Sequence, residues 1–310
     1  MTSGCVTSLF DPITNARVLI GPDDVPMSIA GSTTHGLQEG ISYAVANNWP
    51  LRVLGHEPIY CDSGLYIPPV ANADIDLGVS DIRFNCTVAS PGLTMDSFNS
   101  GRFLHKGRIV HLGQPNVIVR IAPSTVDPFY GQKIIQNADI QFGEIRASAP
   151  VQKIVQLELT SGEIINNQHI DFLKLDGWNG VQNCAQWGLL VTNPGNGLGF
   201  NENSIRIGQL MGFYEAGVQV GLGAENQIFL SDNDWIVNVN SVSGNPTSAF
   251  TTYGSYDYIR MCVTGYAVSQ LQYPLILRPG TQSNRYHIRQ STAQNPVSDS
   301  GANNGGYIGV

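Results

Sequence analysis

Hydrophobic and polar residues alternate in short runs through most of the chain, and two kinds of run recur in a fixed order. The first kind opens with Asn or Asp and is spelled NSIRI, NQIFL, DYIRM and NRYHI, starting at residues 203, 226, 257 and 284. The second kind lies between these and is spelled GLLV, GVQV, SAFTT and YPLIL, starting at residues 188, 217, 248 and 273. Alternation of this type predicts β-strands. Units that recur about every 23 to 31 residues are typical of a solenoid.

The repeat predicts an all-β, single-stranded right-handed parallel β-helix, because each unit contains only strands and turns. Alternation then places Ile205, Ile228, Ile259 and Tyr286 inside, one above another, with Val218, Val220 and Leu222 pointing inward from the second kind of strand. We expect the Asn or Asp that opens each unit to occupy a turn with left-handed backbone geometry. Earlier units from Asn137 and Asn167 fit only with one extra residue. A β-sandwich is the alternative fold, but it does not explain the fixed order of strands.

Residues 34–50 contain the clearest helical pattern, with Leu37, Ile41 and Val45 on one face and Pro50 beyond the end. The expected organisation is an irregular N-terminal docking segment at 1–35, with a possible strand in ARVLIG, then a capping helix and β-helix at 36–290. Residues 291–310 are expected to form a C-terminal tail.

Composition narrows the classes of partner. The chain has 34 Gly and 17 Pro, only 13% charged residues and a net charge of −8. An acidic chain without clustered basic residues does not indicate a nucleic-acid partner. No apolar stretch is long enough for membrane insertion, and the first residues do not resemble a signal peptide, so we expect synthesis in the cytoplasm. The five Cys and six His lack metal-ligand spacing, and no cofactor is expected.

The segments GLQEGISYAVANN and WPLRVLGHEPIYCDSGLYIPP resemble the cap helix and first coils of the pectate-lyase-like superfamily of right-handed parallel β-helices. That superfamily includes phage tailspikes, depolymerases and fungal glucanases. The chain lacks the Gly-His-Gly motif of its polygalacturonase-like members and retains only RIG at Arg206. The resemblance therefore implies a glycan-recognising spike or fibre subunit on the surface of a phage or phage-like particle. Its implied partners are two further copies in a homotrimer, other particle proteins and cell-surface polysaccharide.

Stacked coils would align outward side chains in a column of Arg206, Phe229, Arg260 and His287. Aromatic rings and guanidinium groups suit a sugar chain. Trp178, Trp235, Tyr256 and Tyr258 are further aromatic residues that we expect to contact the glycan. The alternative is that the same face packs against a second subunit.

Carboxylates suggest an enzymatic alternative, a polysaccharide lyase or glycoside hydrolase. We expect Glu202 and Glu225 at matching positions of adjacent coils, with carboxyl groups about 5 Å apart, which is the spacing of retaining glycosidases. Asp232 and Asp234 beside Trp235 form a second candidate pair. Solvated turn residues are the simpler interpretation of these acids, and a purely structural spike segment is the third functional hypothesis.

Overall fold

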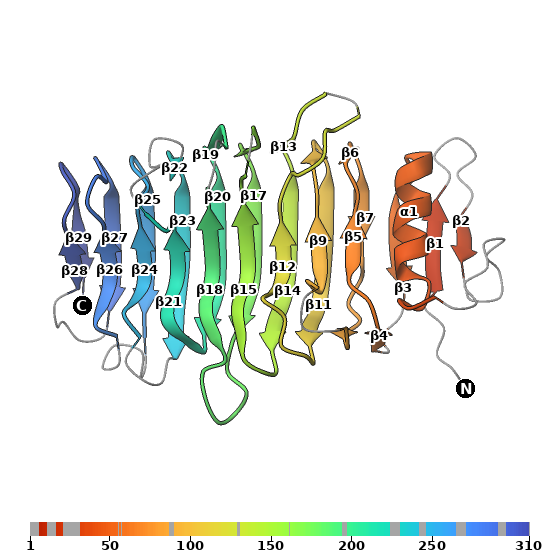
Figure 1. The fold of residues 1–310 in the computed structure, drawn as a ribbon, viewed down its shortest axis with the longest axis horizontal. Coiled ribbons are helices and arrows are strands. Elements are labelled where there is room, and N and C mark those ends of the chain that lie inside the picture. Colours follow the sequence, from red (N-terminus) through yellow and green to blue (C-terminus); the bar gives the residue numbers. More distant parts are fainter. Residues whose placement is uncertain are drawn as a thin grey trace.

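The structure, a computed structural model, describes most of the chain. It covers residues 6–10, 17–20 and 32–309, apart from 55, 57, 87–89, 129–130, 161, 194–196, 224–229, 242–245, 265–270 and 291–295. Within these residues the protein is a parallel β-helix with one α-helix at its N-terminal end (Figure 1).

Three sheets run along the solenoid, and each is built from one strand of each successive coil. In spatial order, sheet A contains β2 (Arg17–Ile20), β1 (Val6–Phe10), β3 (Leu51–Leu54), β7 (Asp74–Asp76), β11 (Arg102–His111), β14 (Asp139–Ala147), β17 (His169–Asp176), β20 (Ser204–Met211), β23 (Asp234–Ser241), β25 (Tyr258–Val263), β27 (Arg285–Gln290) and β29 (Gly305–Gly309). The short strands β4 (Ile59–Cys61) and β8 (Ile82–Phe84) join it beside β11.

Sheet B contains β5 (Leu65–Ile67), β9 (Leu93–Met95), β12 (Val117–Ile121), β15 (Val151–Glu158), β18 (Ala185–Thr192), β21 (Phe213–Val220), β24 (Ser248–Thr252), β26 (Tyr273–Leu277) and β28 (Val297–Asp299). Sheet C contains β6 (Val70–Ala71), β10 (Phe98–Asn99), β13 (Ile134–Gln136), β16 (Ile164–Asn166), β19 (Gly199–Asn201) and β22 (Leu230–Ser231). The described pairings are parallel except those of β1 with β2 and β3. Each coil therefore passes from sheet C to sheet A to sheet B. The repeat predicted two strands in each coil, which correspond to sheets A and B, and did not predict the short strand of sheet C.

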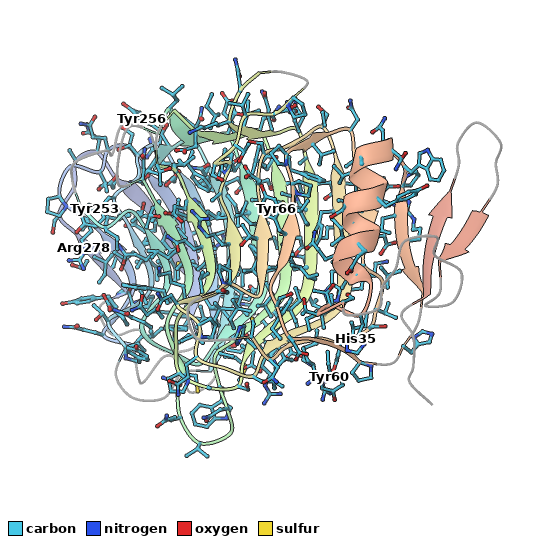
Figure 2. All side chains as sticks on the ribbon, turned by 45° about the vertical axis from the view of Figure 1, so that its right-hand side comes forward. His35, Tyr60, Tyr66, Tyr253, Tyr256 and Arg278 are labelled. Atoms are coloured by element: carbon cyan, nitrogen blue, oxygen red, sulfur yellow. The ribbon has the colours of Figure 1, made fainter. Side chains whose placement is uncertain are left out.

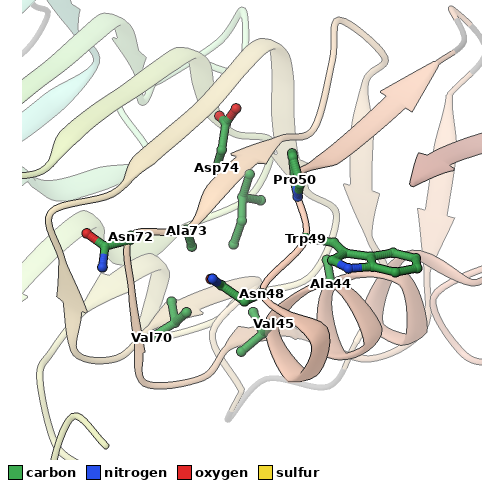
Figure 3. A pocket seen from close by; sticks show the side chains of 10 residues that line it. Ala44, Val45, Asn48, Trp49, Pro50, Val70, Asn72, Ala73 and Asp74 are labelled. Carbon is green, nitrogen blue, oxygen red and sulfur yellow. The ribbon is translucent and has the colours of Figure 1, made fainter. Parts of the chain in front are cut away.

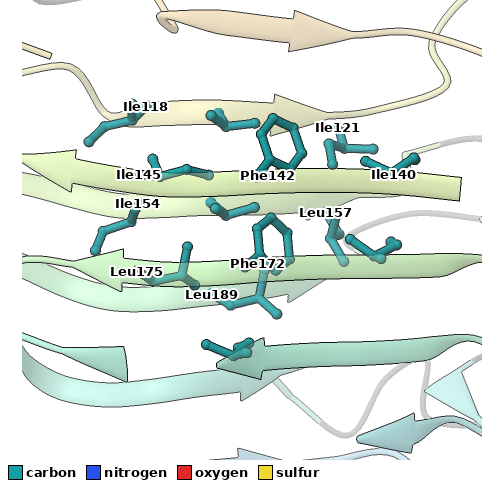
Figure 4. Packing of buried hydrophobic residues seen from close by; sticks show 14 of the residues in the cluster. Ile118, Ile121, Ile140, Phe142, Ile145, Ile154, Leu157, Phe172, Leu175 and Leu189 are labelled. Carbon is teal, nitrogen blue, oxygen red and sulfur yellow. The ribbon is translucent and has the colours of Figure 1, made fainter. Parts of the chain in front are cut away.

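Inward side chains form continuous apolar columns between the sheets. The rings of Phe142 and Phe172 stack with centroids 5.5 Å apart, and aliphatic residues of sheet B face them (Figure 4). A column of equivalent inward positions in sheet A runs Ile140, Ile170, Ile205, Trp235, Ile259 and Tyr286. Burial of these columns supplies the main favourable free energy of folding.

The predicted coil register is wrong at one unit. Ile205 pairs with Trp235, so the sheet A strand of that coil begins at NDWIV and not at NQIFL. Leu230, the last residue of NQIFL, pairs with Phe200 in sheet C. Buried apolar residues also form the short strands of sheet C, so an apolar run after an Asn does not by itself identify a strand of sheet A. Leu222, predicted to point inward, is exposed because β21 ends at Val220.

The corner between sheets C and A has a left-handed residue in each coil. The non-glycine residues with positive φ at this corner are Asn72, Ser100, Asn137, Asn167, Glu202, Asp232, Tyr256, Ser283 and Asn303. The expected left-handed residue was the opening Asn or Asp of each unit. This is correct for Asn137 and Asn167, whereas Asn203, Asp257 and Asn284 lie one position after the left-handed residue. The residue after the left-handed position turns its side chain inward, into the space between the sheets, which explains the difference.

A column of buried side-chain amides follows this corner, and we call it the amide ladder. Its members in successive coils are Gln168, Asn203, Asn233, Asp257, Asn284 and Asn304. The main-chain N–H of Asn203 donates to Oδ1 of Asn233 at 3.2 Å, and that of Asn233 donates to Oδ1 of Asp257 at 2.9 Å. The ladder satisfies polar groups that the turn would otherwise bury unpaired.

Helix α1 (Leu37–Asn47) confirms the predicted capping helix. It buries Leu37, Ile41 and Ala44 against the apolar core at the N-terminal end of the coils, and it ends at Asn48, which has a positive φ. Figure 1 shows α1 between the strands of the first coil and the pair β1 and β2.

The solenoid extends past residue 290, because β28 and β29 of the predicted C-terminal tail pair with β26 and β27. At the other end, residues 1–35 contribute β1 and β2, and β2 includes most of the predicted ARVLIG strand. The docking role of that segment stays a prediction.

Asp257 is the one carboxyl group in the amide ladder. Its Oδ2 is buried and has no hydrogen-bond partner among the described residues. The equivalent amides of Asn203, Asn233 and Asn284 donate to main-chain carbonyl groups, and by register the equivalent acceptor for Asp257 is the carbonyl of Leu230. Burial raises the pKa of Asp257 to about 7, despite the amides of Asn233 that favour the ionised form. A neutral carboxyl group can donate to this carbonyl, whereas a carboxylate cannot.

Asp257→Asn is expected to stabilise the fold most at high pH. Between its ordinary pKa and about 7 the folded chain binds one more proton than the unfolded chain, so the wild type loses stability as pH rises through this range. Asparagine supplies the missing donor at every pH, for a gain of about 1–3 kcal/mol at pH 8 that shrinks toward pH 4. Thermal or urea unfolding across this pH range measures it.

The matched control is Asp232→Asn, which removes an exposed carboxyl group from the same corner and should change stability by less than about 0.5 kcal/mol. A pH-independent effect of Asp257→Asn, or a loss of stability at pH 8, contradicts this account of the ladder.

Candidate functional site

The charged residues of the chain concentrate on the outer face of sheet A. Nine of the eleven ion pairs among the described residues lie on or beside its strands. The equivalent outward column of sheet B begins at Arg120 and continues with Gln156, Leu190, Gln219 and Thr251, which are uncharged and almost fully buried. The outer face of sheet A is therefore the natural surface for a polar ligand.

Predicted site residues from four neighbouring strands converge at the N-terminal ends of β20, β23, β25 and β27. We call this surface the polar face. Corner residues Glu202, Asp232 and Tyr256 occupy one column, Asp234 and Tyr258 a second, and Arg206, Arg260 and His287 a third. Neighbouring members of a column lie on adjacent strands, about 4.8 Å apart, except Arg206 and Arg260, which have Ile236 between them.

Arg260 is the best-anchored side chain of the polar face. Its guanidinium donates to Oδ2 of Asp234 at 2.5 Å and lies over the ring of Tyr258, with 5.3 Å from Cζ to the ring centroid. The hydrogen bond that Arg260 donates to Asp234 raises the pKa of Arg260, so the group is cationic throughout the physiological range. Tyr258 remains 43% exposed and offers the rest of its ring to solvent.

The two ends of the third column differ. Among the described residues, the Arg206 guanidinium makes a single long ionic contact, of 3.7 Å to Asp171, and 56% of its side chain is exposed. His287 packs edge-on against Tyr307, with ring centroids 5.2 Å apart. Tyr307 was not among the predicted site residues because it lies in the supposed tail, although its exposed ring continues the column.

Three predictions need correction or lie outside the described residues. Glu225 and Phe229 fall in the segment 224–229, which the structure does not describe. The outward position assigned to Phe229 belongs to Ile236. Trp235 is fully buried, and its ring centroid lies 6.1 Å from that of Phe200 and 5.2 Å from that of Phe250. It is therefore a core residue and offers no ring to a surface ligand.

Trp178 lies apart from the polar face. It follows the C-terminal end of β17 and forms an isolated bridge with Asn183, whereas the polar face lies at the opposite end of the sheet A strands. Figure 2 shows Tyr256 toward the C-terminal end of the solenoid, together with Tyr253 and Arg278, and Tyr60 toward its N-terminal end.

The carboxylate pair that the fold creates differs from the predicted one. Glu202 is followed in the next coil by Asp232, not by Glu225, because both residues hold the left-handed corner position. Both side chains are exposed, and Oδ2 of Asp232 accepts a hydrogen bond from Ser231 at 2.9 Å. A carboxyl group that acts as a general acid is usually shielded from water or placed against a like charge. Exposure of both groups favours ligand contact over proton transfer.

A separate cavity of about 220 Å³ lies between the end of α1 and the corner Asn72–Asp74 (Figure 3). Its lining includes Val45, Trp49, Pro50 and Val70, and none of the predicted site residues. The described residues contain no group of three or more His, Cys, Asp or Glu side chains arranged for a metal ion. No helix in the described part of the chain has the length and apolar character needed to cross a membrane.

Comparison with protein-family models, curated proteins and solved structures finds no match. We therefore infer the function from the geometry of the polar face.

Proposed function

We propose that the protein is a carbohydrate-binding β-helix whose polar face binds a polysaccharide chain. The observation that supports this most is the Asp234–Arg260–Tyr258 cluster, in which a fixed guanidinium lies over a half-exposed aromatic ring. Sugar rings pack against aromatic faces, and a guanidinium supplies several donors in a fixed plane for hydroxyl or carboxylate oxygens.

The repeat of the coils extends this site along the solenoid. Tyr256, Tyr258, Arg206, His287 and Tyr307 bring rings and cations to neighbouring strands at the spacing of a sheet. A ligand that is itself a repeating chain can contact several of them at once, which raises affinity without any deep pocket.

The biological setting that we propose is a spike or fibre of a phage or phage-like particle that attaches to host surface polysaccharide. Its support is the resemblance of residues 34–290 to the right-handed, pectate-lyase-like β-helices of tailspikes, together with the parallel β-helix architecture. The homotrimer, the particle proteins as partners and the location on the particle surface stay predictions, and light scattering tests the trimer.

A depolymerase is the second candidate function. Its support is the adjacency of Glu202 and Asp232 in successive coils beside the aromatic side chains of the polar face. Retaining glycosidases use two carboxyl groups about 5 Å apart, and adjacent coils give a comparable spacing.

Tyr258→Ala and Arg260→Gln are each expected to weaken polysaccharide binding about five- to thirtyfold, because each removes a ring or a charged donor at the centre of the polar face. Glycan-array binding, followed by calorimetry on the best ligand from a panel of purified bacterial capsular and exopolysaccharides, measures the effect. The matched control is Tyr214→Ala, which removes an equally exposed ring from β21 on sheet B and should leave affinity unchanged. Equal losses in Tyr214→Ala and Tyr258→Ala would argue against the polar face.

The exposed acids give a second prediction, that the wild-type protein binds without cleaving. Size-exclusion profiles and reducing-end assays of the bound polysaccharide should stay constant over hours, and the double variant Glu202→Gln/Asp232→Asn should bind within about threefold of wild type, because it removes only exposed, weakly partnered charges. Shortened chains with the wild type and intact chains with the double variant would establish the depolymerase instead.

A further inference from the structure

A shallow hollow of about 200 Å³ lies on the outer face of sheet A. It lies toward the N-terminal end of the solenoid, away from the polar face. Three arginines line it, Arg83, Arg108 and Arg146, together with the apolar side chains Val110 and Leu112. The hollow is at the C-terminal ends of β8, β11 and β14, whereas the polar face is at the N-terminal ends of later strands.

The strand register explains why the arginines surround one point. Val110 pairs with Arg83 on one side and with Arg146 on the other. The Cα atoms of the two arginines are therefore two strand spacings apart, about 10 Å. Arg108 precedes Val110 by two residues on β11 and so points to the same side of the sheet. A small group resting over Val110 is within reach of all three guanidinium groups.

Two of the three arginines are already held in place. Oδ2 of Asp81 accepts hydrogen bonds from Arg83 at 3.3 Å and from Arg108 at 2.8 Å. Arg83 also donates to the hydroxyl of Tyr60 at 3.1 Å and lies over its ring, 5.5 Å from the centroid. A ligand that meets these two groups has little side-chain entropy to remove.

Arg146 is different, because no described residue forms a hydrogen bond or an ion pair with its guanidinium. Two acidic residues nearby in the same sheet, Glu144 and Asp176, form ion pairs with Lys174, at 3.2 and 2.8 Å. Four cations, Arg83, Arg108, Arg146 and Lys174, thus face three carboxylates, Asp81, Glu144 and Asp176, on a chain whose net charge is −8. A purely structural role, in which the arginine side chains cover Val110, would explain the burial of Val110. That role does not explain an excess of positive charge on an acidic protein.

We propose that this hollow binds the carboxylate of an acidic sugar residue, with Arg146 as the main contact and Arg83 and Arg108 beside it. Guanidinium groups bind carboxylates through paired hydrogen bonds. Leu112, which is 44% exposed, and the ring of Tyr60 give the sugar ring an apolar surface. The sugar part of this proposal rests on the proposed function, whereas the anion part rests on the three arginines alone.

The test is calorimetric binding of a short glucuronate-containing oligosaccharide and of its neutral glucose counterpart, at 20 and 200 mM salt. The acidic oligosaccharide should bind more tightly, and its affinity should fall at the higher salt concentration. Arg146→Gln should lower its affinity about tenfold or more, because it removes the unpaired charged donor. Arg289→Gln is the matched control, since Arg289 is exposed on the same sheet but lies on β27. Thermal unfolding of both variants checks that they are folded.

Equal affinity of the Arg146→Gln and Arg289→Gln variants, or equal affinity of wild type for the acidic and neutral oligosaccharides, overturns the proposal. Inorganic sulfate separates a general oxyanion site from a sugar site. If sulfate displaces the acidic oligosaccharide only at a concentration about tenfold above that of the oligosaccharide, the result supports a sugar site. Displacement by sulfate at an equal concentration overturns the sugar assignment. The proposed function at the polar face is tested separately, by the affinity of the Arg260→Gln variant for a neutral ligand. Arg146→Gln should not change the affinity for that neutral ligand.

Discussion

Hydrogen bonding between successive coils fixes the position of every other group in this protein. Within the coils, strands pair in parallel with the strands of the coils before and after, so equivalent residues stand above one another in all three sheets. The corner between sheets C and A could break this order, because the chain turns sharply there and carries polar main-chain groups into the interior. The amide ladder prevents this, because from Gln168 to Asn284 the main-chain N–H of each member donates to the side chain of the next member, ending at Asn304.

The same repetition creates the surfaces that we assign to ligands. A left-handed residue at each corner cannot bury its side chain, so Glu202, Asp232 and Tyr256 form an outward row. The next outward positions bring Tyr258 and Arg260 beside that row, and Asp234 holds Arg260 in place. The hollow around Val110 arises in the same way from earlier coils. Both sites are shallow, which suits an extended chain of sugars better than a small molecule that must be enclosed.

The fold could be predicted because the coils near residues 203, 257 and 284 place Asn or Asp at the ladder position, directly before an alternating strand. The earlier coils were harder to place for a physical reason. Asn137 and Asn167 occupy the left-handed corner itself, and Ala138 and Gln168 take the ladder position. This accounts for the one extra residue in their sequence pattern. The unit at residue 226 was misplaced because its apolar run leads into a short strand of sheet C, at Leu230, and not into sheet A.

Part of the candidate site could be predicted for the same reason. Arg260, His287, Tyr258 and Arg206 follow from correctly placed coils, whereas Phe229 and Glu225 were paired with them through the misplaced unit. Trp235 was mistaken for a surface residue because its neighbours Asp232 and Asp234 are polar. The hollow around Arg146 could not be found from sequence, since its arginines come from three coils of unequal length and β11 has a register shift between His105 and Arg108.

The register of β20 against β23 is the most direct test of this account, since the polar face exists only if Arg206 lies beside Ile236. We would introduce Arg206→Cys with Ile236→Cys, and separately Arg206→Cys with Arg260→Cys, after replacing Cys5 and Cys262 by Ser. Neighbouring positions about 4.8 Å apart permit a disulfide, and positions about 10 Å apart do not. Mass spectrometry after mild oxidation should find the 206–236 disulfide and no 206–260 disulfide. The opposite result would contradict the coil register and the polar face with it.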